Sequence, residues 1–208
     1  MAGLTFELNA DGADHVVVTQ ATFRTVMTAL ARPARVSELP LHARSRDMKL
    51  GRLYPSSAAL LLALADFETS IWLAPELAEA PTCDVLRFET GARIIDEPGE
   101  ADFAVVSALH EMPPLTTFKS GTAEYPDRSA LVVVQVRGFD GAGSAGTLTF
   151  AGPGIVDQTE LRIDPGLPEF ARQWQTNRAG FPCGVDLVFA TPRSIAALPR
   201  SARLIETR

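Results

Sequence analysis

The run GFPCGVDLVFATPRSIAALPR, residues 180–200, combines a turn, an apolar strand and two arginines that follow prolines. Residues 185–189 read Val-Asp-Leu-Val-Phe, a pattern typical of a strand that is buried on both faces of a parallel or mixed sheet. Before this strand, Pro182 keeps Phe181 out of the helical region, and Gly184 permits a turn that other residues resist. The run therefore predicts a tight turn that leads into a central strand, with the rest of the chain as its scaffold.

Asp186 places a carboxylate inside this apolar strand. An unpaired buried carboxylate is costly, so we expect it to accept hydrogen bonds from backbone amides or from Arg193. The alternative is a contact with a ligand or with another subunit. Arg193 and Arg200 each follow a proline, and a guanidinium on a stiff backbone suits carboxylates and phosphates. Both arginines are therefore candidates for an anion site, with ordinary surface exposure as the alternative.

Length and composition indicate one α/β or α+β domain over residues 1–208, in which residues 1–18 form an arm or an edge segment. A chain of this size buries about 70% of its extended surface. No apolar run approaches the roughly 18 residues of a membrane span, and no early basic and apolar leader is visible, so we expect a cytoplasmic protein. Cys83 and Cys183 lack CxxC spacing and are interpreted as reduced thiols.

The net charge of -6 argues against a general nucleic-acid binder, but the charges are unevenly distributed. Residues 24–52 carry a local excess of basic side chains: Arg24, Arg32, Arg35, Arg44, Arg46, Lys49 and Arg52 against Glu38 and Asp47. Residues 66–102 carry ten acidic side chains against Arg87 and Arg93. Two solvated faces explain this pattern, and an anionic ligand or a charged partner protein is the alternative.

Periodicity and capping residues predict the remaining elements. We expect a helix capped by Thr19 that ends at Arg32-Pro33, and three further helices over residues 58–65, 81–90 and 168–177, the first two capped by Ser56 and Thr82. Gly91 is predicted to stop the helix at 81–90 in a left-handed conformation. Short strands are predicted at residues 70–73, 94–95, 103–106, 130–136, 147–150 and 161–163, with 130–136 and 147–150 paired as a hairpin.

Several apparent motifs fail in their context. Residues 141–146 match GxGxxG, but a strand follows where dinucleotide binding needs a helix N-terminus, so they are interpreted as a loop. The three histidines are widely separated, so no metal site is predicted. Cys183 could be a nucleophile in a turn, but no local base accompanies it, which favours a structural role.

A small-molecule pocket, if present, is predicted to have two walls. One is the glycine turn at residues 152–155, which contains Gly152 and Gly154, and the other is the loop at residues 181–186. Glycines let backbone amides approach an anion closely. Simple turn geometry is the alternative explanation for the same glycines.

The order of segments resembles the H subunit of the bacterial carbon-phosphorus lyase, the system of organic phosphonate catabolism. The resemblance covers nearly the whole chain and rests on TFRTVMTALARP at 22–33, LLLALADFETSIWL at 60–73, LRFETGA at 86–92, GTAEYP at 121–126, LTFAGPGI at 148–155, FPCGVDLVF at 181–189 and ALPRSA at 197–202. Two positions depart from the expected family pattern. Ala34 stands where glycine is expected and Glu89 where histidine is expected, so a role for that histidine is not carried over.

The resemblance implies an α/β fold with a mixed central sheet flanked by helices, similar to the large domain of pyridoxal-phosphate transferases but without the cofactor. It also implies a homodimer that assembles with the G, I and J subunits. With an ATP-binding-cassette-like L subunit, that group forms ribose 1-alkylphosphonate 5-triphosphate from ATP and an alkylphosphonate. A required subunit without catalytic residues, which contacts partner proteins and an anionic phosphonate or nucleotide portion, is the leading hypothesis.

Two other functions stay open at this stage. One is a free-standing pyridoxal-phosphate transferase in which Lys119 forms the Schiff base and Asp186 contacts the ring nitrogen. Lys49, the other lysine, lies in an equally loop-like context. The second is a dimeric scaffold with no ligand.

Overall fold

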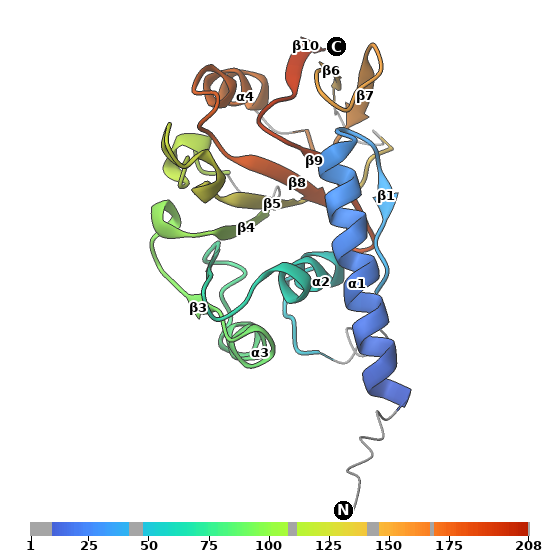
Figure 1. Cartoon of the computed structure of the whole chain (residues 1–208), viewed down its shortest axis with the longest axis vertical. Coiled ribbons are helices and arrows are strands. Elements are labelled where there is room, and N and C mark those ends of the chain that lie inside the picture. The colour runs from blue at the N-terminus through green and yellow to red at the C-terminus, as the bar shows by residue number, and fades with distance from the viewer. Residues whose placement is uncertain (1–9, 42–47, 108–111, 141–145, 167–168, 208) are drawn as a thin grey trace, which may run out of the picture.

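The computed structural model describes residues 10–41, 48–107, 112–140, 146–166 and 169–207. Its described residues form two sheets and four α-helices (Figure 1). The larger sheet has the order β1 (Ser37–Glu38), β9 (Ser194–Leu198), β8 (Asp186–Ala190), β5 (Leu131–Gln135), β4 (Phe103–Ser107), β2 (Ser70–Leu73) and β3 (Arg93–Ile94). The smaller sheet has the order β10 (Arg203–Thr207), β6 (Thr147–Ala151) and β7 (Thr159–Arg162). The helices are α1 (Ala10–Ala31), α2 (Pro55–Leu64), α3 (Ala80–Thr90) and α4 (Phe170–Ala179), and three 3-10 turns are η2 (Pro98–Glu100), η3 (Leu115–Thr117) and η4 (Pro126–Arg128).

The larger sheet is mixed, as the sequence predicts for an α/β protein. Strands β3, β2, β4, β5 and β8 run parallel to one another, whereas β9 is antiparallel to β8 and β1 is antiparallel to β9. The strand predicted at residues 185–189 is therefore central, with β5 on one side and β9 on the other. β9 itself was not predicted, because its alanines lack the β-branched pattern of a typical strand.

The core is densest where four strands align their side chains. Val105 of β4 pairs with Val133 of β5, which pairs with Val188 of β8, which pairs with Ala197 of β9, and all four residues are fully buried. Such nearly continuous apolar strands are characteristic of sheets that are covered on both faces. The burial explains why the Val-rich sequences at 131–135 and 185–189 are reliable strand signals.

The hairpin predicted between residues 130–136 and 147–150 is wrong. β6 pairs with β7 and β10 in the smaller sheet, while both edges of β5 are occupied by β4 and β8. Because β5 is a central strand, it has no free edge for a hairpin partner. The GxGxxG segment lies almost entirely outside the described residues, and the element that follows it is the predicted strand, β6.

Helix α1 ends as predicted at Arg32-Pro33 but begins at Ala10, so Thr19 is not its N-cap. Once a packed turn has nucleated a helix, extension by further residues costs little, so the valines before Thr19 do not stop it. On this helix Val26 is buried, whereas Phe23 and Met27 are exposed. The single-domain organisation stays a prediction. Of the arm predicted at residues 1–18, residues 10–18 belong to α1.

Two predicted helix caps are wrong. The hydroxyl of Ser56 donates to the carbonyl oxygen of Thr191 instead of accepting a hydrogen bond from an amide of α2. The hydroxyl of Thr82 is buried and has no hydrogen-bond partner among the residues that the structure describes. Tyr54 and Glu79 occupy the two N-cap positions, each without a side-chain cap. Both helices carry proline in the first turn, where the missing amide hydrogen removes part of the need for a cap.

The predicted stop of α3 is confirmed. Gly91 adopts a left-handed conformation with φ 72°, and its amide donates to the carbonyl oxygen of Arg87. At the other end of the chain, α4 packs onto the sheet through Phe170, whose ring contacts Phe189 at a centroid distance of 5.7 Å. The fully buried Trp174 on the same helix donates its indole hydrogen to the carbonyl oxygen of Ala202, 3.1 Å away.

The smaller sheet and α3 lie at opposite ends of the molecule in Figure 1, with α1 running along the long axis between these ends. The C-terminal end of α1 lies near the smaller sheet. The end of α1 belongs to the segment with an excess of basic residues, and α3 belongs to the segment with an excess of acidic residues. The two segments thus contribute to surfaces that are separated in the structure.

Candidate functional site

Asp186 is satisfied by one arginine, and that arginine is Arg200. Its guanidinium donates from Nε to Oδ1 at 3.1 Å and from Nη2 to Oδ2 at 2.7 Å, and its backbone amide donates to Oδ1 at 2.7 Å. The Nη1 atom of Arg200 donates to the carbonyl oxygen of Pro126 at 2.6 Å. This two-pronged geometry is the strong form of an arginine–carboxylate pair. The expected pairing of Asp186 with a backbone amide is confirmed, and the suggested pairing with Arg193 is wrong.

Arg193 lies at the other end of β8, in the turn that joins β8 to β9. Its backbone amide donates to the hydroxyl of Thr191, and its exposed guanidinium has no hydrogen bond or ion pair with the described residues. The two predicted anion-site arginines are therefore separated along the length of a strand. Arg200 is committed to internal partners, and only Arg193 is free.

The turn before β8 is held by a residue that sequence patterns did not reveal. The buried Asn177 donates from Nδ2 to the carbonyl oxygen of Val185 and accepts the Val185 amide hydrogen at Oδ1, with distances of 3.0 and 2.8 Å. Gly184 has φ 121°, and a Cβ atom on it would lie 2.8 Å from Oδ1 of Asn177. The glycine is therefore required by turn geometry and close packing.

Phe181 and Cys183 contribute to the same turn. The ring of Phe181 is half exposed and is covered on one face by the guanidinium of Arg178, 4.5 Å from its centroid. The thiol of Cys183 forms no hydrogen bond with the described residues, while its amide donates to the carbonyl oxygen of Gly180. The surroundings of Cys183 match a structural cysteine.

The glycine turn after β6 packs closely against the end of α1. Gly154 has φ 80°, and a Cβ atom on it would lie 2.1 Å from the carbonyl oxygen of Ala31. Gly152 has φ 143°, and its Cβ would lie 3.1 Å from the carbonyl oxygen of Ser201. Both predicted glycines thus stand where two backbones approach closely, in a conformation that favours glycine.

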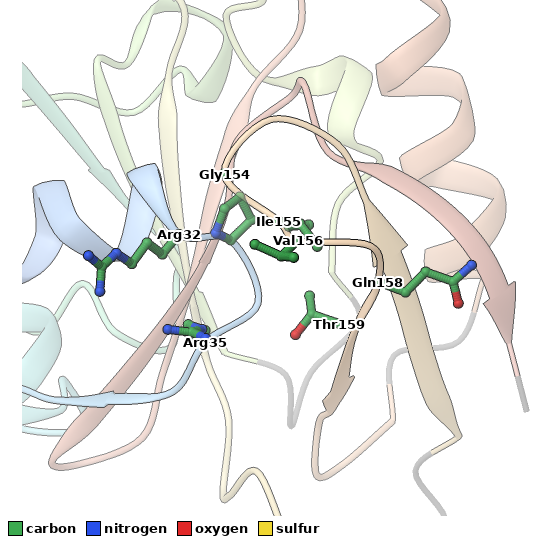
Figure 2. Close-up of a pocket in the computed structure, with 8 residues that line it drawn as sticks. Arg32, Arg35, Gly154, Ile155, Val156, Gln158 and Thr159 are labelled. Carbon is green, nitrogen blue, oxygen red and sulfur yellow. The ribbon is translucent and has the colours of Figure 1, made fainter.

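A pocket of about 400 Å³ opens between this turn and the end of α1. It is lined by Arg32, Pro33, Arg35, Gly154, Ile155, Val156, Gln158 and Thr159. Figure 2 shows Arg32 and Gln158 extending outward in opposite directions, with Arg35, Val156 and Thr159 between them. Of the seven predicted site residues, Gly154 alone lines this pocket.

The charged side chains that line the pocket are both basic. No acidic residue lines it, and neither guanidinium has a hydrogen bond or an ion pair with the residues that the structure describes. Arginine recognises phosphate and carboxylate groups by paired hydrogen bonds. Prediction from sequence missed Arg32 and Arg35 as site residues, although the basic excess of residues 24–52 was the signal that contained them.

The backbone conformation of Ala34 explains why glycine is expected at this position. Ala34 follows Arg32-Pro33, is buried, and has φ 61°. A positive φ is the conformation in which glycine is favoured, which accounts for the expectation of glycine at this position. The amide of Ala34 donates to the carbonyl oxygen of Ala197 in β9 at 2.8 Å. This hydrogen bond holds the segment that contains Arg35 against β9.

Lys119 and Asp186 do not meet as a cofactor site would require. The Nζ atom of Lys119 donates to Oδ1 of Asp102 at 2.6 Å, and Asp186 is paired with Arg200. Burial raises the pKa of the Asp102 carboxyl, but hydrogen bonds from Lys119 and Ser70 outweigh this effect and lower the pKa below its ordinary value. Lys119 and Asp186 are thus engaged in two separate ion pairs.

Other reactive groups are equally constrained in the described part of the chain. Burial raises the pKa of the Cys83 thiol, more than the nearby Arg87 lowers it, so the nucleophilic thiolate is disfavoured. No group of three or more His, Cys, Asp or Glu side chains among the described residues is placed to hold a metal ion. None of the described helices has the length and apolar character that a bilayer crossing requires.

Fold and site together define an α/β protein with a mixed sheet and a pocket that is lined by two arginines. The profile of the family described as "Bacterial phosphonate metabolism protein (PhnH)" matches residues 11–205, and the chain belongs to this family. The chain is 37% identical over 194 residues, 92% of its own length and 92% of the relative's, to the alpha-D-ribose 1-methylphosphonate 5-triphosphate synthase subunit PhnH of Rhizobium meliloti (strain 1021). It is 32% identical over 189 residues, 89% of its length and 85% of the relative's, to the putative C-P lyase subunit protein HtxG of Stutzerimonas stutzeri.

Proposed function

We propose that this chain is a subunit of a carbon-phosphorus lyase complex, required for the synthesis of ribose 1-alkylphosphonate 5-triphosphate from ATP and an alkylphosphonate. The observation that carries the proposal is the similarity to a named synthase subunit over 92% of both chains. The proposed location is the cytoplasm, where ATP is available.

We assign the chain an accessory role without catalytic residues of its own. The support is that Lys119 and Asp186, the groups which the transferase alternative requires, are both engaged in internal ion pairs. The candidate pocket offers guanidinium, hydroxyl and amide groups but no nucleophile with an adjacent base. We also propose that the fold is similar to that of the large domain of pyridoxal-phosphate transferases.

The proposed protein partners are the G, I and J subunits and a second copy of the chain. A stripe of exposed apolar side chains on α1, formed by Val16, Phe23 and Met27 at helical spacing, is the surface we propose for the homodimer. These residues lie on one face of the helix, because Phe23 and Met27 follow Val16 by seven and eleven residues, which correspond to about two and three helical turns. A helix face of this kind commonly packs against its equivalent in a symmetric dimer.

We expect the chain to co-elute with co-expressed G, I and J subunits in size-exclusion chromatography. Cells that lack the gene are expected to lose growth on methylphosphonate as sole phosphorus source and to regain it when the gene is supplied. Light scattering on the chain alone gives its mass and tests the dimer. A chain that never joins the partners, and that is dispensable for growth on methylphosphonate, would refute the complex role.

We further propose that the pocket receives an anionic phosphonate or phosphate group through Arg35, with Arg32 at its mouth. Replacement of Arg35 by glutamine is expected to weaken binding of tripolyphosphate or methylphosphonate by roughly tenfold or more, because it removes charge-assisted hydrogen bonds of about 1.5–3 kcal/mol. Isothermal titration calorimetry measures the change.

The matched control for this experiment is Arg24→Gln, which removes an exposed arginine of α1 that does not line the pocket. It is expected to leave the affinity within about a factor of two, since exposed charges act weakly at physiological ionic strength. Equal losses in Arg35→Gln and Arg24→Gln would mean that the anions bind through diffuse charge, and the pocket would not be their site.

A further inference from the structure

Two phenylalanines are unusually exposed at the end of the molecule that carries α3. The side chains of Phe88, on α3, and Phe67, in the turn before β2, are 86% and 74% exposed. The two lie in neighbouring segments, because a Cβ atom on Gly91, which ends α3, would lie 3.4 Å from Cβ of Phe67. Exposed aromatic side chains that occur together commonly mark a surface for another protein.

A groove of about 610 Å³, with both apolar and charged side chains in its lining, lies beside the same helix. Its lining includes Trp72 and Leu73 at the carboxyl end of β2, Ile94 and Ile95 after α3, and Asp84 and Arg87 on α3. Phe88 follows Arg87 directly and lies one helical turn beyond Asp84, so it stands at the border of the groove. The groove and Phe88 together form what we call the α3 surface, defined by these residues.

The segments that form the α3 surface, within residues 66–100, are rich in acidic side chains, and Asp84 and Asp96 line the groove itself. Among the described residues of this region, the exposed carboxylates are those of Asp66, Glu68, Glu79, Asp84, Glu89, Asp96, Glu97 and Glu100. The exposed basic side chains are those of Arg87 and Arg93, and Arg87 already forms an ion pair with Asp84 at 3.3 Å. The region thus combines an apolar anchor site with a strongly negative rim.

This combination selects the kind of partner. A second copy of the chain placed symmetrically on the same surface would bring two acidic rims together, which costs free energy through like-charge repulsion. A partner with basic side chains around an apolar one would instead be attracted by the rim and anchored by the groove. Charge therefore argues for a different, cationic protein at this surface.

We propose that the α3 surface docks a basic segment of another protein subunit, with an apolar side chain of that segment in the groove beside Phe88. The proposal rests on the proposed membership of a multi-subunit complex. Because α3 and the smaller sheet lie at opposite ends of the molecule (Figure 1), a partner bound there leaves the arginine pocket open. The α3 surface would then hold this subunit in the complex, while the arginine pocket at the opposite end would remain free to bind the anion.

The test is co-purification of the full-length chain with its co-expressed partner subunits. Phe88→Ser is expected to weaken assembly by about tenfold or more, because it removes the exposed aromatic anchor. Glu89→Lys, which reverses a rim charge, is expected to slow assembly and to reduce its sensitivity to salt. The matched control is Ile205→Ser, which removes a half-exposed apolar side chain of β10 at the opposite end and is expected to assemble as the wild type does.

Each outcome has a distinct meaning. Thermal unfolding should give the same Tm for all three variants and the wild type, since the altered side chains are on the surface. Failure of the wild type to bind any subunit would overturn the proposed function and this proposal together. Wild-type assembly that Phe88→Ser and Glu89→Lys leave intact would overturn this proposal alone, as would a Phe88→Ser chain whose own mass falls from dimer to monomer.

Discussion

Substitution of Gly154 by alanine is expected to destabilise the protein by about 3 kcal/mol or more. The new Cβ would lie 2.1 Å from the carbonyl oxygen of Ala31 and 2.9 Å from Cδ of Pro33. Backbone at the end of a helix cannot yield as a flexible side chain does, so the turn must separate from α1. A positive φ of 80° adds about 1 kcal/mol for a residue that carries Cβ. Urea unfolding followed by circular dichroism measures the loss.

Gly180→Ala is the matched control for this substitution. The nearest atoms to a Cβ on Gly180 lie 3.5 and 3.7 Å away, which is ordinary contact, and its φ of -79° suits any residue. Its effect is expected to stay within about 0.5 kcal/mol. If Gly154→Ala were as stable as Gly180→Ala, the close approach of the turn to α1 would not exist in solution.

Removal of the Arg200 side chain is the second large effect, with an expected loss of about 3 kcal/mol in Arg200→Ala. The Arg200 side chain is 14% exposed and that of Asp186 is 23% exposed, so the substitution leaves a carboxylate largely buried without its cation. It also leaves the carbonyl oxygen of Pro126 without its donor. The free energy of unfolding, obtained from urea denaturation at pH 7, measures the loss.

Arg193→Ala is the control, because the Arg193 side chain is exposed and unpaired among the described residues. It is expected to change stability by less than about 0.5 kcal/mol. The double substitution Arg200→Met with Asp186→Leu should recover part of the loss, since it removes the buried charge as well as its partner. Equal stability of Arg200→Ala and Arg193→Ala would show that the pair contributes nothing, contrary to its geometry.

The contrast between these two arginines changes how a loss of function should be interpreted. A defect in complex assembly or in growth on methylphosphonate caused by Arg200→Ala would follow from disruption of the turn before β8, not from a lost anion contact. Arg35 and Arg193 are the positions where an anion effect can be measured without this complication. Arg35 has the stronger case because it lines a pocket.

Local sequence patterns located most elements of the larger sheet. The valine-rich strands β5 and β8, the end of α1 at Arg32-Pro33 and the stop of α3 at Gly91 were all predictable, because each depends on neighbouring residues alone. Patterns failed where a long-range contact replaces a local one. Ser56 resembles a cap but its hydroxyl is directed to Thr191, and β6 resembles the partner of β5 but pairs with β10.

The candidate site divides in the same way. That Asp186 needs a partner, and that the glycines at 152 and 154 mark a tight turn, follows from residue chemistry and from the steric limits of L-amino acids. The identity of the partner as Arg200 does not follow, and neither does the meeting of Arg35 with Thr159 around one pocket. Backbone conformation and the cost of buried charge are properties of a few adjacent residues, and sequence reveals them. Which distant groups satisfy them depends on how the sheets and α1 pack together, and this packing is a property of the whole folded chain.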